Sequence, residues 1–213
     1  MLDIVTLGLA PGYVPYSDAW ATQRRRHEEV VAGTRPDTLF LLEHEAVYTA
    51  GARSTPDDRP DDGTPVVDVD RGGRITWHGP GQLVGYPIVR LAEPVDVVAH
   101  VRRLEELLMT ALREFGVAGR RVEGRSGVWA GPHGGESKVA AIGVRVQRGV
   151  TMHGFALNCD NSLEPFDRIV PCGIADAGVT TVSEIIGSRV APREVAGTVA
   201  SVFSAAFDAE VAA

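Results

Sequence analysis

Cysteine, lysine and long apolar stretches are all scarce in this 213-residue chain. Two cysteines cannot form a disulfide framework, so we expect a reducing compartment, by default the cytoplasm. Apolar runs such as Leu39 to Leu42 are far too short to cross a bilayer. The first residues, Met1 to Ile4, have no basic region ahead of a long apolar stretch, which argues against a signal peptide. The sequence therefore predicts a cytoplasmic protein that does not enter a membrane.

An excess of positive charge is also missing, because 28 acidic residues outweigh 21 basic ones and leave a net charge of −7. This balance disfavours nucleic acid and anionic membrane surfaces as partners. His78, His153, Cys159 and Cys172 could be drawn as a zinc set, but no close pair such as Cys-x-x-Cys anchors them, so we expect no metal. The glycine-rich segment 131–138 lacks the glycine that precedes the lysine of a phosphate loop, so no nucleotide cofactor is expected.

The scarcity of lysine is more informative, because 20 of the 21 basic residues are arginine and the remaining one is Lys138. Such a bias suggests that arginine serves wherever a surface cation is needed. Lysine differs in that its ammonium can lose a proton at an accessible pKa, whereas guanidinium cannot. Chance is one explanation of the surviving lysine, and a role as a base is the other.

Alternating apolar and helical patterns predict one domain over residues 1–213, of α+β (mixed α/β) class, with helices packed on a mixed sheet. Asp96 as N-cap and Gly116 as stop signal bound the clearest helix. Thr181 and Glu184 form a capping box before a short helix, and Pro192 begins the last one. A further helix is expected over 17–32, and strands are expected over 4–9, 38–42, 66–69, 84–89, 127–130, 139–147 and 150–158.

The dipeptide Arg148-Gly149 between two strand-like runs predicts a tight hairpin turn of type I′. In that register Gly143 faces Gly154 and Ala141 faces Ala156, so four small side chains share one face of the hairpin. Such a face is either a trough about as wide as an alkyl chain or a surface packed tightly against a helix. Parity puts Lys138 on the opposite face, unless the strand begins after it or a bulge lies near Ala140.

The two cysteines differ in context. Cys159 continues the alternation of Phe155 and Leu157 and is predicted to be buried. Cys172 follows a proline and precedes a glycine, a turn in which a thiol would be accessible. A reactive thiol with an amine nearby suffices for acyl transfer, although a structural turn cysteine is the alternative.

Four ordered blocks carry a family resemblance. The run Arg-Gly-Gly-Arg-Ile-Thr-Trp-His-Gly-Pro-Gly-Gln at 71–82 is similar to the signature of the octanoyltransferases of lipoate synthesis. Lys-Val-Ala-Ala-Ile-Gly at 138–143, His-Gly-Phe at 153–155 and Pro-Cys-Gly-Ile at 171–174 resemble that family's other blocks, in order. The resemblance implies a biotin/lipoate protein ligase-like catalytic fold.

It also implies Cys172 as the acyl-thioester nucleophile and Lys138 as its catalytic partner. The donor would be octanoyl-acyl carrier protein, and the acceptors would be lipoyl domains of 2-oxoacid dehydrogenases and the glycine cleavage H protein. An ATP-dependent lipoate or biotin ligase and a non-catalytic carrier-binding protein remain as alternatives. The substrate-binding residues implied by the resemblance are Arg71, Gly72, Gly73, Arg74, Ile75, Thr76, Trp77, His78, Ala141, Ile142, Gly143, Gly154, Phe155 and Ala156.

Overall fold

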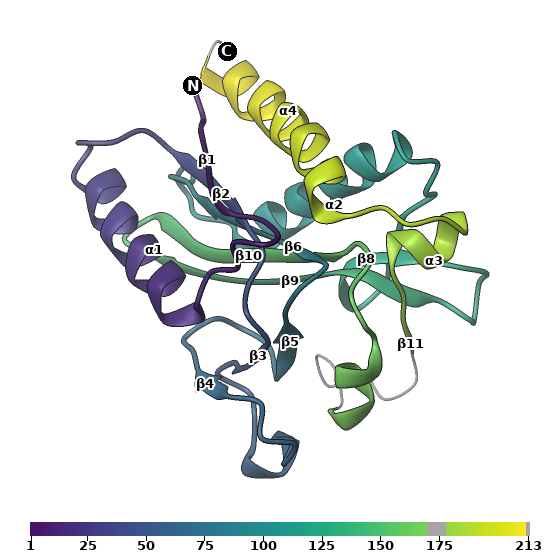
Figure 1. Ribbon diagram of the computed structural model, residues 1–213. Coiled ribbons are helices and arrows are strands. Elements are labelled where there is room, and N and C mark those ends of the chain that lie inside the picture. Colours follow the sequence, from purple (N-terminus) through teal and green to yellow (C-terminus); the bar gives the residue numbers. More distant parts are fainter. Residues whose placement is uncertain (170–177, 212–213) are drawn as a thin grey trace.

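The computed structural model describes residues 1–169 and 178–211 and contains two β-sheets with helices on both sides (Figure 1). The large mixed sheet has eight strands among these residues, and its main path runs β1-β2-β6-β10-β9-β8-β7, with β11 pairing with β9. Its strands are β1 (Asp3–Gly8), β2 (Thr38–Leu42), β6 (Gln82–Ile88), β7 (Arg120–Val122), β8 (Arg125–Ala130), β9 (Ser137–Gln147), β10 (Val150–Asn158) and β11 (Gly178–Val179).

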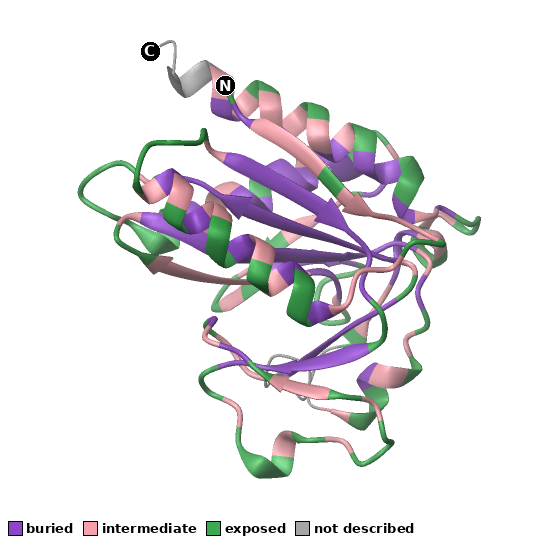
Figure 2. Ribbon diagram, turned by 60° about the vertical axis from the view of Figure 1, so that its left-hand side comes forward, coloured by how far each residue is buried: buried purple, intermediate pink, exposed green. Residues whose placement is uncertain are grey.

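The two faces of the large sheet are covered differently. Helices α2 (Val97–Arg113) and α4 (Pro192–Val211) pack on one face, where Leu104, Phe155 and Phe203 belong to one buried cluster. Helix α1 (Tyr16–Val31) packs on the other face, and its Ala19 joins a second cluster. Figure 2 shows the buried central strands between these layers. No described helix is both long and apolar enough to cross a membrane.

A small sheet lies on the α1 side and bounds the candidate site. Its strand order is β4-β3-β5, with β3 (Val47–Ala50) in the middle, β4 (Val66–Asp68) parallel to it and β5 (Thr76–His78) antiparallel. Tyr48, Trp77 and Phe166 pack together behind this sheet. Two short 3₁₀ turns, η1 (Pro56–Asp58) and η2 (Glu164–Arg168), and the short helix α3 (Val182–Ile186) complete the described elements.

Most of the predicted elements are confirmed, several to the residue. The Asp96 side chain caps α2 by accepting a hydrogen bond from the Ala99 N–H at 2.9 Å, and Gly116 follows the helix with a φ of 73°. The capping box of Thr181 and Glu184 starts α3 as predicted. Strands β3, β5, β7 and β11 were not predicted from the sequence.

The predicted hairpin is also confirmed. Arg148 and Gly149 both have positive φ, 51° and 72°, as a type I′ turn requires. The pairing of β9 with β10 sets Gly143 opposite Gly154 and Ala141 opposite Ala156. The alternate residues of this hairpin, among them Phe155, face the α2–α4 side. The small residues therefore share a face, as parity predicts.

Candidate active site

A pocket with about 220 Å³ of open space lies between the small sheet and the α1-side face of β6, β9 and β10. Twelve of the predicted substrate-binding residues line it. They are Arg71, Gly72, Gly73, Arg74, Thr76, His78, Ala141, Ile142, Gly143, Gly154, Phe155 and Ala156. Ile75 and Trp77 do not line the pocket, since both are buried with Tyr48 in the cluster behind the small sheet. Tyr16, Tyr86, His153, Arg53 and Arg125 also line it and were not predicted.

The floor of the pocket is less open than its small residues suggest. A Cβ at Gly154 would collide with the backbone oxygen of Gly85 and with the Pro87 ring, so this glycine is needed for the close approach of β6. A Cβ at Gly143 would lie 3.0 Å from Cδ of Arg71, so that position is covered by an arginine stem. Ala141 and Ala156 remain as the open part of the predicted trough.

Arg71 is held firmly where it crosses the floor. Its Nη1 donates hydrogen bonds to the backbone oxygens of Gly72 and Arg74 at 3.0 and 2.9 Å. Its Nη2 donates to the backbone oxygen of Thr49 at 2.8 Å and to Thr49 Oγ1 at 2.9 Å. The residue is only 8% exposed. These bonds fix a buried positive charge and its aliphatic stem at one end of the pocket.

Lys138 lies at the other end of the pocket because β9 contains a bulge. Val128 pairs with Ala140 but Trp129 pairs with Lys138, so one residue of β9 has no partner in β8. This confirms the predicted bulge, which brings Lys138 to the same pocket as Ala141. The lysine is 5% exposed, and its Nζ lies 4.7 Å from the centre of the Trp129 ring. Within residues 1–169 and 178–211, the ammonium has no hydrogen bond or ion pair.

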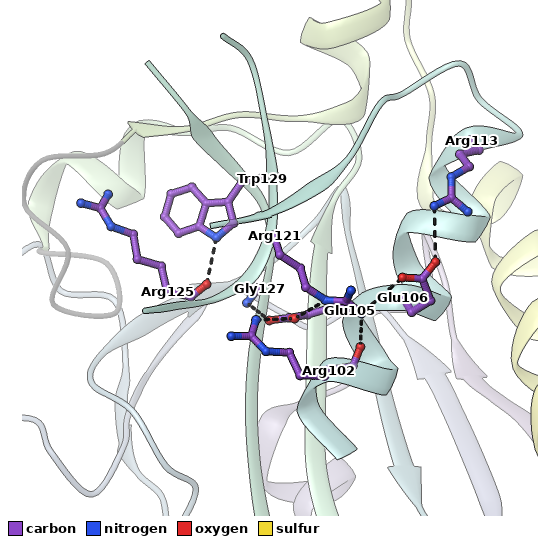
Figure 3. A network of polar contacts seen from close by, with 8 residues as sticks. All are labelled: Arg102, Glu105, Glu106, Arg113, Arg121, Arg125, Gly127 and Trp129. Atoms are coloured by element: carbon purple, nitrogen blue, oxygen red, sulfur yellow. Dashed lines mark hydrogen bonds and ion pairs between the residues drawn. The ribbon is translucent and has the colours of Figure 1, made fainter. Parts of the chain in front are cut away.

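A buried carboxylate of α2 holds β8, the strand that pairs with the bulged part of β9 (Figure 3). Glu105 on α2 is fully buried and accepts hydrogen bonds from Gly127 N at 2.9 Å, Arg121 Nε at 3.0 Å and Arg102 Nη1 at 2.8 Å. Gly127 has a φ of 109°, and a Cβ there would collide with the backbone oxygen of Ala140 and lie 3.4 Å from Cε of Lys138. The Glu105 network thus holds the strand against which Lys138 packs.

A hydrogen-bond chain runs from β10 and β6 to the pocket residue His78, and its direction is determined. The Thr180 carbonyl accepts from Asn158 Nδ2 at 3.1 Å, so Asn158 Oδ1 is free to accept from Gln82 Nε2 at 2.9 Å. Gln82 Oε1 then accepts from His78 Nδ1 at 2.8 Å. Burial lowers the pKa of His78 to about 3, so the ring is neutral and its Nε2 accepts from Thr49 Oγ1 at 3.3 Å. His78 therefore presents no charge to the pocket.

Tyr16 and Tyr86 add two neutral hydroxyls to the pocket lining. His44 Nδ1 lies 2.8 Å from the Val14 carbonyl and must donate to it, so Nε2 accepts from the Tyr86 hydroxyl at 2.7 Å. Burial lowers the pKa of His44 to about 4 and raises the pKa of Tyr16 to about 12. Tyr16 stacks on His78 with ring centres 6.3 Å apart.

His153 occupies a strained position beside the pocket, with a φ of 59°. Its backbone N–H donates to Gln23 Oε1 at 2.9 Å, and its Nε2 lies 2.7 Å from Asp70 Oδ1. Asp70 also pairs with Arg145. Burial, together with the charges of Arg71 and Arg145, lowers the pKa of His153 to about 3, so the ring is neutral and Nε2–H donates to Asp70. Among the described residues, its Nδ1 has no hydrogen-bond partner.

Of the two cysteines, the structure describes only Cys159. Cys159 is completely buried, as predicted, and burial raises the pKa of its thiol far above the ordinary value. A thiol in that state is a poor nucleophile. Cys172 lies outside the described residues. The next described strand, β11, pairs Gly178 with Ser137 and Val179 with Lys138.

The part of the chain that the structure describes contains no group of three or more histidine, cysteine, aspartate or glutamate side chains placed to hold a metal ion. Of the four residues that could be drawn as a zinc set, His78 and His153 line the pocket, whereas Cys159 lies in the core cluster on the α2–α4 side. The site can instead position an acyl group against small side chains, with Lys138 and Arg71 in the same pocket.

Comparison with known proteins identifies the family. The model of the lipoyl protein ligase A/B catalytic domain matches residues 15–204. An octanoyltransferase from Clavibacter sepedonicus is 64% identical over 200 residues, which cover 92% of this chain and 86% of that protein. An octanoyltransferase from Leifsonia xyli subsp. xyli is 59% identical over 214 residues, covering 100% of this chain and 96% of that one.

The chain belongs to the octanoyltransferase family. It is accordingly an acyltransferase, as the four sequence blocks imply. Among solved structures, the bipartite lipoate protein ligase from Thermoplasma acidophilum is similar, with a TM-score of 0.74, 15% identity and coverage of 98% of this chain and 85% of that one. This likeness confirms the biotin/lipoate protein ligase-like fold.

Proposed function

We propose that this family member transfers an octanoyl group from octanoyl-acyl carrier protein to a lysine of a lipoyl domain, with a Cys172 thioester as intermediate. The observation that carries the proposal is the placement of Lys138, buried at one end of a pocket with a small-residue floor and without a hydrogen bond or ion pair among the described residues. The membership of the octanoyltransferase family supports the choice of acyl group.

In the first half-reaction the Cys172 thiolate attacks the carbonyl carbon of the donor thioester. The ammonium of Lys138 favours the thiolate over the thiol when the sulfur lies beside it. The tetrahedral intermediate collapses as the bond between the carbonyl carbon and the carrier sulfur breaks, and the carrier leaves as a thiol after taking a proton from the ammonium of Lys138. The octanoyl group is then held on Cys172, with its chain along Ala141 and Ala156.

In the second half-reaction the ε-amine of the acceptor lysine attacks the enzyme thioester. Lys138, having given up a proton in the first half-reaction, accepts the proton that the amine nitrogen loses as the amide forms. Cys172 departs as the thiolate and the enzyme returns to its starting state. Thioester exchange is nearly balanced and amide formation from a thioester is downhill, so the sequence of steps requires no ATP.

The acceptors we propose are the lipoyl domains of 2-oxoacid dehydrogenases and the glycine cleavage H protein. The described similarity to a lipoate protein ligase fold supports a lipoyl-domain acceptor. We also propose that residues 1–213 act as a single catalytic domain in the cytoplasm, where a reducing environment keeps Cys172 as a thiol.

A transfer assay tests this function against its two rivals. We expect the enzyme to octanoylate a purified lipoyl domain when given octanoyl-carrier protein without ATP. An ATP-dependent ligase would require ATP and free octanoate instead, and a non-catalytic carrier-binding protein would form a complex with the carrier but yield no octanoylated domain. Either of these results would replace the proposal.

A further inference from the structure

We infer that Arg71 sets the upper limit on acyl chain length by closing the pocket at Gly143. This inference rests on the proposed function, because it takes the acyl carbonyl to lie near Lys138. Lys138, Ala141 and Gly143 follow one another along β9 and all line the pocket, so the open position Ala141 lies between Lys138 and the Arg71 stem that covers Gly143. A chain whose carbonyl lies near Lys138 points its methyl group toward this stem.

The contacts at Gly143 locate the point at which the acyl chain would be blocked. A Cβ on Gly143 would lie 3.0 Å from Cδ of Arg71, 3.3 Å from the Gly72 oxygen and 3.6 Å from Nη1 of Arg71. The segment is attached to β9 at this point, because Gly72 N donates to the Val144 oxygen at 3.1 Å. The methyl end of an acyl chain would therefore meet the aliphatic stem of Arg71, with the charged head turned to backbone and hydroxyl oxygens.

The Arg71 side chain is held rigidly because both terminal nitrogens of its guanidinium donate hydrogen bonds. Nη1 donates to two carbonyl oxygens of its own loop, and Nη2 donates to the oxygen and hydroxyl of Thr49 on β3. The other side is also filled, since a Cβ on Gly51 would lie 2.7 Å from Nη1. A chain that extended past Gly143 would have to displace this hydrogen-bonded head, and the surrounding backbone leaves little room for it to move.

The dimensions agree with a medium-length chain. Gly143 lies five positions after Lys138 in β9, and because this stretch contains the bulge, the distance is at most roughly 16 Å at about 3.3 Å per residue. Removing roughly 2 Å of van der Waals thickness at each end leaves at most about 12 Å. An extended octanoyl thioester spans roughly 10 Å from sulfur to methyl carbon, given C–C bonds of about 1.5 Å, whereas a dodecanoyl thioester needs roughly 15 Å. Octanoyl fits this interval and dodecanoyl does not.

The test measures kcat/KM for hexanoyl-, octanoyl-, decanoyl- and dodecanoyl-carrier protein in variants of Arg71. Arg71→Ala removes the stem, so the ratio of dodecanoyl to octanoyl transfer should rise at least tenfold. Arg71→Lys keeps a stem through Cδ and a donor for the Thr49 oxygen, so its ratio should stay within about threefold of wild type. Arg74→Ala, which removes a different arginine of the same pocket, should change all chain lengths together.

Gly143→Ala gives an independent readout in case Arg71→Ala does not fold. Its added methyl group would lie 3.0 Å from Cδ of Arg71 and push the stem toward the acyl chain, so octanoyl transfer should fall relative to hexanoyl transfer by at least fivefold. An unchanged dodecanoyl-to-octanoyl ratio in a folded Arg71→Ala protein, or equal loss of hexanoyl and octanoyl transfer in Gly143→Ala, would overturn the inference. Transfer by the wild-type enzyme without ATP tests the proposed function separately. Calorimetric binding of free fatty acids of the same lengths measures the chain-length limit of the pocket even if no transfer occurs.

Discussion

Replacing Gly127 by alanine should damage catalysis more than it damages the fold, because this glycine borders Lys138. Gly127 has a φ of 109°, and an added Cβ would collide with the Ala140 oxygen and lie 3.4 Å from Cε of Lys138. The backbone conformation costs an alanine roughly 1–2 kcal/mol, and the collision adds roughly 1–3 kcal/mol if the bulge shifts to relieve it. We therefore expect destabilisation of about 2–5 kcal/mol. We expect the backbone of the bulge that positions Lys138 to shift.

A displacement of about 1 Å at a catalytic group can cost roughly 100-fold in rate. We expect kcat for octanoyl transfer to fall by about that factor in Gly127→Ala, with a shifted pH profile. Gly116→Ala is the matched control, since Gly116 also has positive φ, 73°, but has nothing within 4 Å of its added Cβ. The control should lose roughly 1–2 kcal/mol of stability and keep its kcat and pH profile.

The assay combines melting curves with transfer rates from pH 6 to 9 at a temperature where both variants are folded. Glu105→Gln provides a second approach from the other side of Gly127, because it removes the buried carboxylate that accepts the Gly127 N–H. A folded Gly127→Ala enzyme with wild-type kcat and an unshifted pH profile would refute the argument that this strand positions Lys138.

Four further outcomes are expected. Cys172→Ser should abolish transfer, whereas Cys159→Ala should keep it and cost mainly stability, as steady-state rates and melting curves will show. Lys138→Arg keeps the charge but should lose most activity across the pH range, because guanidinium cannot accept a proton; full activity would remove the case for a base. Ala156→Leu fills the volume of about three methylenes, each of which contributes about 0.8 kcal/mol when buried, so octanoyl transfer should fall much more than butanoyl transfer. Equal loss for all chain lengths would instead show that Ala156 has only a packing role. The pKa of His78 is about 3 in the folded state and 6.5 in the unfolded state, so below pH 6.5 the unfolded state binds the extra proton and the free energy of unfolding decreases as pH falls. In denaturant titrations, the decrease in the free energy of unfolding from pH 7 to 5 should be about 2 kcal/mol smaller in His78→Gln than in the wild type.

Local signals in the sequence were sufficient for most of the fold. The cap at Asp96 and the stop at Gly116 bound α2 because both act through the backbone of neighbouring residues. The turn at Arg148-Gly149 fixed the register of β9 and β10, and that register predicted the row of small residues. It also predicted that the strand begins after Lys138 or has a bulge near Ala140, and the structure has the bulge.

Elements that depend on distant partners were missed. β3 is buried at all four positions and so shows no alternation, and β5 lies inside the glycine-rich segment that the sequence favours as a loop. These strands form because they pair with each other across the chain, with Tyr48 opposite Trp77. Pairing of that kind leaves no local pattern to find.

The candidate site divides in the same way. Lys138 was identified because it is the single lysine of an arginine-rich chain, which is a property of the sequence alone. The contact between Arg71 and Gly143, and the burial of His153 beside Asp70, arise only when distant segments fold together. Glu105 gave no signal either, since a glutamate in a helix is ordinarily solvated, yet it is fully buried beneath Gly127.

The measurement that tests the central claim most directly is the mass of the intact enzyme after incubation with octanoyl-carrier protein in the absence of ATP and of any acceptor. We expect an increase of one octanoyl group, which peptide digestion maps to Cys172 and which is discharged when a lipoyl domain is added. An unmodified enzyme that still transfers octanoyl to the domain, or an acyl group found on Cys159, would contradict the central claim.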